Sequence, residues 1–134
     1  MHEIILFTLA LHVLSGVFWG GSTFVMARTG KFPGRLVGSQ IGASVVAIFS
    51  GGALFLLLHA GTPGTAERVL GVGATAAILA AVTQAIVVGR AARMLPLVTP
   101  EKISGLESRM AVGQRVAAPL LALTIVCMAT ARFI

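Results

Sequence analysis

The chain has few charged residues and almost no cysteine. Charged residues make up 10% of its 134 positions, which is too few for an ordinary soluble domain. The single cysteine, Cys127, excludes an intrachain disulfide and a cysteine metal cluster built within one chain. Because Cys127 falls inside an apolar segment, we expect it to be a small packing residue.

Two further absences narrow the class of membrane protein. No segment alternates apolar and polar residues as the strands of a closed barrel do, so helices are the remaining way to cross a bilayer. The N-terminus, Met-His-Glu, has no basic region before its apolar run, and that run is too long for a cleaved signal peptide. We therefore expect an all-α integral membrane protein whose first span is retained.

The residues that are present are mostly apolar, at 57% of the chain, and the mean hydropathy is +0.98. Four apolar segments approach the ~20 residues that span a hydrocarbon core. They predict a single domain, residues 1–134, with four transmembrane helices in an up-down-up-down antiparallel bundle. Thr99 and Pro100 are typical of a helix start, so a short helix at about 100–110 should run into the last span. The expected spans are about 4–27, 37–59, 69–89 and 111–131.

Basic residues are distributed unevenly between the two ends of this bundle. Eight follow the first and third spans, whereas only Arg68 and Arg132 lie at the other end. The positive-inside rule then places the 28–36 and 90–110 loops in the cytoplasm and both termini outside, as in a bacterial inner-membrane protein. These residues flank spans without aromatic platforms between them, so we expect a lipid bilayer and no nucleic acid as partner. The eight are Arg28, Lys31, Arg35, Arg90, Arg93, Lys102, Arg109 and Arg115.

His12 is the most informative single residue, because it lies inside the first apolar segment. An ionisable side chain in hydrocarbon is costly and is by default a candidate for function. Helical spacing places His12, Ser15, Gly16, Trp19 and Thr23 on one face, which should point into the bundle. The functional interpretations of His12 are a haem or metal ligand or a proton relay. The structural one is a neutral imidazole bonded to a neighbouring helix. Residues expected to contact lipid or other helices include Leu6, Phe7, Val13, Leu14 and Val17.

Glycines recur at four-residue spacing on the first two predicted spans. Gly16 and Gly20 form one pair, and Gly34, Gly38 and Gly42 form a longer series. Small residues at this spacing let membrane helices approach closely, which predicts packing between helices. A contact in a homo-oligomer or larger membrane complex, or room for a flat cofactor, remains open for these glycine-rich faces.

Polar side chains also occur inside the second and third spans. Gln40 and Ser44 lie one turn apart on the second span, and Thr83 and Gln84 lie near the inner end of the third. We expect their amides and hydroxyls to form hydrogen bonds across helices.

Two more histidines are predicted at the outer membrane surface. His59 ends the second span, and His2 begins the first at the same level. Imidazoles bind copper and zinc, so His2, His59 and His12 are the candidate metal ligands. His12 and His59 are expected to differ by ~12 Å in depth, which opposes their holding one haem from two sides.

The segment LHVLSGVFWGGSTF, residues 11–24, resembles the first-helix pattern of the copper-resistance D-like and HemJ-type membrane families. In those families a buried histidine precedes a tryptophan and then small residues. The resemblance implies a four-helix membrane protein associated with haem or copper. HemJ-type proteins are haem b-binding protoporphyrinogen oxidases, which would make His12 the haem ligand. That family also uses a lysine in a later span, whereas Lys31 and Lys102 lie in predicted loops here.

Two hypotheses of different classes follow. In the first, the protein binds haem b through His12, beside Ser15, Gly16 and Trp19, and acts in electron transfer or as a porphyrin oxidoreductase. In the second, it is a non-enzymatic integral subunit or copper-handling protein that packs against partner helices. A small-solute transporter is a weaker third reading, because four spans lack the usual inverted repeat.

Overall fold

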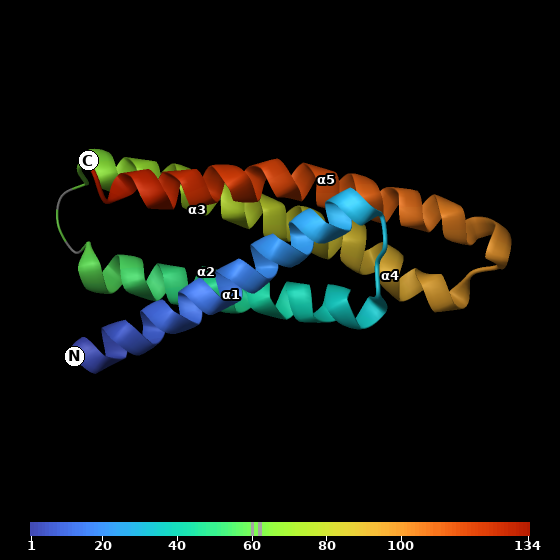
Figure 1. Cartoon of the computed structure of the whole chain (residues 1–134), viewed down its shortest axis with the longest axis horizontal. Coiled ribbons are helices and arrows are strands. Elements are labelled where there is room, and N and C mark those ends of the chain that lie inside the picture. The colour runs from blue at the N-terminus through green and yellow to red at the C-terminus, as the bar shows by residue number, and fades with distance from the viewer. Residues whose placement is uncertain (60, 62) are drawn as a thin grey trace.

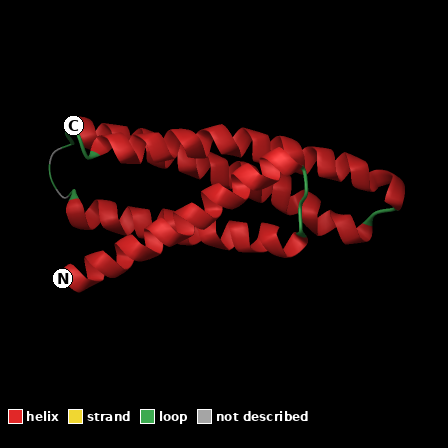
Figure 2. Ribbon diagram, viewed as in Figure 1, coloured by secondary structure: helices red, strands yellow, loops and turns green. Residues whose placement is uncertain are grey.

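The computed structural model describes residues 1–59, 61 and 63–134, and these residues form helices joined by short connections (Figures 1 and 2). Four helices are long and apolar enough to cross a membrane. Successive long helices run antiparallel in Figure 1, which confirms the predicted bundle. The elements are α1 (His2–Thr29), α2 (Gly34–Leu58), α3 (Thr65–Thr83), the π-helix η1 (Gln84–Gly89), α4 (Arg90–Met94), the 3-10 helix η2 (Leu95–Leu97) and α5 (Pro100–Ala131).

The third long helical segment is longer than the sequence indicated. Residues 90–97 were expected to lie in a connection, but α3, η1, α4 and η2 follow one another without a break from Thr65 to Leu97. The predicted helix before the fourth span is confirmed, because α5 starts at Pro100 with Thr99 as its N-cap and continues to Ala131. The hairpin between η2 and α5 therefore extends past the connection between α1 and α2 (Figure 1).

The connection between α1 and α2 is short because each helix ends or begins at a residue suited to it. Gly30 ends α1 in the left-handed conformation, with φ 66°, and its N–H donates to the carbonyl of Met26 at 3.1 Å. Glycine adopts this conformation without a Cβ clash. Pro33 then occupies the N-cap position of α2 in an extended conformation.

The core consists of two apolar layers. One layer is rich in alanine, and the other contains larger side chains toward the α1–α2 connection. Alanines allow the helices of the first layer to lie close together, as expected in membrane bundles. The first layer is Trp19, Ala47, Ala77, Ala80, Ala117 and Leu121. The second is Met26, Val37, Val88, Ala91, Leu106 and Met110.

The outward face of α1 agrees with the sequence. Phe7 is 72% exposed, Leu14 70% and Val17 69%, and Leu6 and Val13 are exposed as well. Such a surface is compatible with contact with lipid.

The expectation that the glycine series packs helices together is wrong for Gly34, Gly38 and Gly42 within one chain. A Cβ built on any of them would have no described atom within 4 Å. Close approaches occur at other glycines, whose virtual Cβ atoms would meet neighbouring side chains. These are Gly51 against His12, Gly73 against Cys127, Gly89 against Ile41 and Gly113 against Val87 and Val88.

Candidate functional site

The polar face of α1 points into the bundle along part of its length. Trp19 and Thr23 are buried, whereas His12, Ser15 and Gly16 are half-buried. The prediction that this stripe faces into the bundle is therefore confirmed most fully at Trp19 and Thr23. The Oγ of Ser15 donates to the carbonyl of Leu11 in its own helix at 2.7 Å.

Trp19 and Thr23 join a hydrogen-bonded network that connects all four long helices. The Trp19 indole N–H donates to Oε1 of Gln84 at 2.6 Å. The Oγ1 of Thr23 accepts from Nε2 of Gln84 and from Nε2 of Gln40, each at 2.8 Å. Its own hydroxyl donates to the Trp19 carbonyl at 2.7 Å. One threonine oxygen thus holds α1 to both α2 and η1.

Gln114 brings α5 into the same network. Its Oε1 accepts from Gln84 at 2.9 Å and from Gln40 at 3.3 Å. Its Nε2 donates to Oε1 of Gln40 at 2.8 Å and to the sulfur of Met26 at 3.8 Å. The three amides are at most 1% exposed.

Every polar hydrogen of this network has an acceptor. A glutamine amide has two N–H donors, and each of the three amides uses both. A buried network is stabilising when all its members are paired, and it is costly when one is not. Because no donor is left for a ligand, we interpret the network as a structural one that fixes how the four spans pack.

The expectation of cross-helix bonds is confirmed for Gln40 and Gln84. It is wrong for Ser44 and Thr83, whose hydroxyls donate to the carbonyls of Ile41 and Leu79 in their own helices. A hydroxyl reaches the carbonyl three or four residues back, whereas an amide has a longer side chain and two donors. Gln114 was not among the side chains expected to bond across helices.

His12 is held against α2 rather than within the network. Its Nδ1 lies 2.9 Å from the carbonyl of Ala47 and 3.3 Å from Oγ of Ser50. A carbonyl only accepts, so Nδ1 donates in this arrangement, and in the neutral imidazole Nε2 then holds the lone pair. No described residue forms a hydrogen bond with Nε2. Histidines that bind metals use this orientation, in which one nitrogen donates and the other ligates.

Gly51 provides the space for the His12 ring. A Cβ at position 51 would lie 2.8 Å from Cε1, 3.2 Å from Nδ1 and 3.7 Å from Nε2 of His12. The imidazole therefore lies directly on the backbone of α2. Next to the ring on α1, a Cβ on Gly16 would meet no described atom within 4 Å.

The other two histidines lie apart from His12. His59 follows Ser50 by nine residues on α2, or ~13 Å along the helix. Its ring stacks on Phe55 with centroids 5.4 Å apart, and its buried Nδ1 has no hydrogen-bond partner among the described residues. The N-terminal end of α1 lies away from the C-terminal end of α2 in Figure 1.

Among the described residues, no three histidine, cysteine or acidic side chains gather closely enough to hold a metal ion. Metal binding by His2, His12 or His59 therefore stays a prediction. Contact of Ser15, Gly16 or Trp19 with a cofactor likewise stays a prediction. Trp19 is 3% exposed and lies in the alanine-rich layer.

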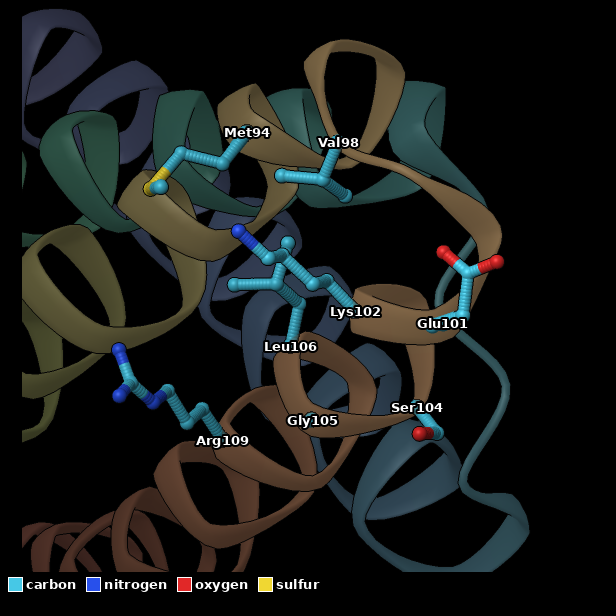
Figure 3. Close-up of a pocket in the computed structure, with 8 residues that line it drawn as sticks. All are labelled: Met94, Val98, Glu101, Lys102, Ser104, Gly105, Leu106 and Arg109. Carbon is cyan, nitrogen blue, oxygen red and sulfur yellow. The ribbon is translucent and has the colours of Figure 1, made fainter.

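A groove of about 360 Å³ lies on the projecting hairpin, away from all of these residues (Figure 3). Lys102 and Arg109 extend toward the same side of α5, whereas the Glu101 carboxylate and the Ser104 hydroxyl point away from them. None of the predicted site residues lines this groove.

Comparison of the chain with models of protein families, with curated proteins and with solved structures finds no match in any of the three.

Proposed function

We propose that this protein is an integral membrane protein that binds haem b through Nε2 of His12. The observation that carries the proposal is the contact of His12 Nδ1 with the Ala47 carbonyl, which in the neutral imidazole leaves Nε2 with a lone pair. The resemblance of residues 11–24 to haem-associated membrane families supports the same ligand.

The described residues would supply one protein ligand to a haem group. His12 would supply it, Ala47 and Ser50 would hold the ring, and Gly16 would leave room beside it for a flat macrocycle. Haem would add one-electron chemistry, in electron transfer or porphyrin oxidation. Ser50 contacts the His12 ring, and His59 lies ~13 Å further along α2. His59 could therefore bind the same haem only if α2 were arranged differently.

An absorption spectrum of the detergent-purified protein, with and without added haemin, tests the proposal. We expect a Soret band that His12→Ala abolishes or strongly shifts. His59→Ala is the matched control, because it removes an imidazole far from the site, and it should leave the band unchanged. A wild-type protein that is colourless as purified and leaves the spectrum of added haemin unchanged, or a band that survives His12→Ala intact, would contradict the assignment.

The alternative is a non-enzymatic subunit or copper-handling protein. It is favoured by the open Gly34, Gly38 and Gly42 face, where no described atom lies within 4 Å of a virtual Cβ. Such a face suits a partner helix or a second copy of the chain. In this case a colourless protein would copurify with a membrane partner or as an oligomer, and Gly38→Leu would disrupt that assembly.

We further propose a placement in the bilayer from the arginines. Each proposed span contributes one residue to the polar network and carries an exposed arginine five or six residues away from it, toward the end of the bundle with the α1–α2 connection. This separation is about 7–9 Å along the helix. These arginines would mark one headgroup level, which we assign to the cytoplasmic side of the inner membrane. The pairs are Thr23 and Arg28, Gln40 and Arg35, Gln84 and Arg90, and Gln114 and Arg109.

The opposite headgroup level follows from Arg68 and Arg132, the two arginines at the other end of the bundle. Arg68 precedes Arg90 by 22 residues, and Arg132 follows Arg109 by 23. At 1.5 Å per residue these separations are about 33 and 35 Å, close to the ~30 Å thickness of a hydrocarbon core. Both chain ends would then lie outside.

A further inference from the structure

A second groove, of about 560 Å³, runs along the outer surface of α3 and α5. Its lining is apolar except for Arg68 at one end and Thr75 in the middle. The Thr75 hydroxyl donates to the Gly71 carbonyl at 2.9 Å, so its hydrogen-bonding capacity is used within the helix. The guanidinium is then the one polar group available to a ligand. The lining residues are Arg68, Gly71, Val72, Thr75, Ala76, Leu79, Leu120 and Leu123.

The length and polarity of the groove match one leaflet of a bilayer. Arg68 and Leu79 are eleven residues apart on α3, or ~17 Å, and half of a hydrocarbon core is ~15 Å. In the placement proposed above, Arg68 lies at the headgroup level and Leu79 near the middle of the membrane. The cationic end of the groove therefore coincides with lipid phosphates and its apolar part with acyl chains.

The adjacent carboxylate, Glu67, bonds to the start of α3 and is not among the residues that line the groove with Arg68. Neighbours in sequence do not face each other on a helix. The Oε2 of Glu67 accepts from the backbone N–H of Gly64 at 2.8 Å, at the start of α3.

We propose that this groove binds an anionic phospholipid, with its phosphate on Arg68 and one acyl chain along Val72, Leu79 and Leu123. The lining includes the small residues Gly71 and Ala76, which leave space for the chain. The inference rests on the proposed placement in the membrane but not on haem binding. The absorption spectrum and the lipid measurement below therefore succeed or fail separately.

Native mass spectrometry of the detergent-purified protein with phosphatidylglycerol or phosphatidylcholine tests the proposal. We expect the wild type to retain phosphatidylglycerol over phosphatidylcholine. Arg68→Gln should lower the affinity for phosphatidylglycerol about fivefold and leave that for phosphatidylcholine unchanged. Gly71→Leu should lower the retention of both lipids, because its side chain would fill the groove. A Cβ at position 71 meets no described atom within 4 Å, so the variant should fold.

Two matched variants control for charge and for surface bulk. Arg132→Gln removes a cation from the same end of the bundle, and Gly52→Leu adds the same side chain at an open site on α2. Neither residue lines the groove, and neither variant should change retention. Equal retention of the two lipids by the wild type, or equal losses in the controls, would overturn the proposal. Displacement of the lipid by glycerol phosphate would also overturn it, by showing that a soluble phosphate suffices.

Discussion

The indole N–H of Trp19 on α1 donates to Oε1 of Gln84, the first residue of the π-helix, at 2.6 Å. This bond joins the first span to the third, and both side chains are at most 3% exposed. π-helical turns within helices are rare, so this one marks a departure from regular geometry where the network is built. The two residues are 65 positions apart in the chain.

Gln84→Leu should destabilise the protein, because it leaves the Trp19 indole N–H buried without an acceptor. It also removes the donors to Thr23 and Gln114. We expect a loss of about 1–3 kcal/mol in the free energy of unfolding. Trp19 is the only tryptophan in the chain, so its fluorescence during denaturant titration in detergent reports the change directly.

Thr83→Ala is the matched control for this variant. Thr83 precedes Gln84, but its hydroxyl bonds only to Leu79 in its own helix. The unfolding midpoint and the Trp19 emission should remain close to those of the wild type. A Gln84→Leu protein as stable as Thr83→Ala would show that the network contributes little.

The sequence predicted the elements of this fold better than it predicted their contacts. Apolar segment length and the Thr99–Pro100 signal were sufficient for four antiparallel helices and for the early start of α5. The glycine spacing was not sufficient to identify contacts, because Gly38 and Gly73 both lie on apolar helices and differ only in what packs against them. Spacing along one helix shows which residues share a face. Which helix packs against that face depends on the arrangement of the whole bundle.

The candidate site was also predictable only in part, because one segment shows its own residues but not the residues of other helices that contact them. His12 was identified because an ionisable residue in an apolar run is conspicuous in a single segment. Its partners, the Ala47 carbonyl and Ser50, depend on the register between α1 and α2. The meeting of Gln114 with Gln40 and Gln84 depends on three helices at once.

Alanine substitutions should separate the glycines that pack from those that do not. In Gly73→Ala, the new Cβ would lie 2.9 Å from Cβ of Cys127 and 3.4 Å from the Thr124 carbonyl oxygen, so α3 and α5 must move apart. We expect a loss of about 1–3 kcal/mol. Gly38→Ala meets open space and should raise stability by roughly 0.5–1 kcal/mol through helix propensity. Thermal unfolding in detergent measures both, and equal shifts would refute the distinction.

The eight basic residues at one end of the bundle and the two at the other predict the orientation of the chain. A reporter fused after Ile134 should be active on the outer side of the membrane. One inserted after Val98, in the connection before α5, should be active in the cytoplasm. Paired phosphatase and fluorescent-protein fusions measure this. A cytoplasmic C-terminus would reverse the proposed sides while leaving the antiparallel order intact.

Gly51→Ala should displace the His12 ring without removing it. The added Cβ would lie 2.8 Å from Cε1, and the ring must tilt or α1 must shift, which lengthens the bond from Nδ1 to the Ala47 carbonyl. If His12 binds haem, the Soret band should shift or weaken while the protein stays folded. Gly52→Ala, in open space one residue along, should leave the spectrum unchanged and, like Gly38→Ala, raise stability by roughly 0.5–1 kcal/mol. An unchanged spectrum in a haem-bound Gly51→Ala protein would indicate that the orientation set by α2 is not what prepares His12 as a ligand.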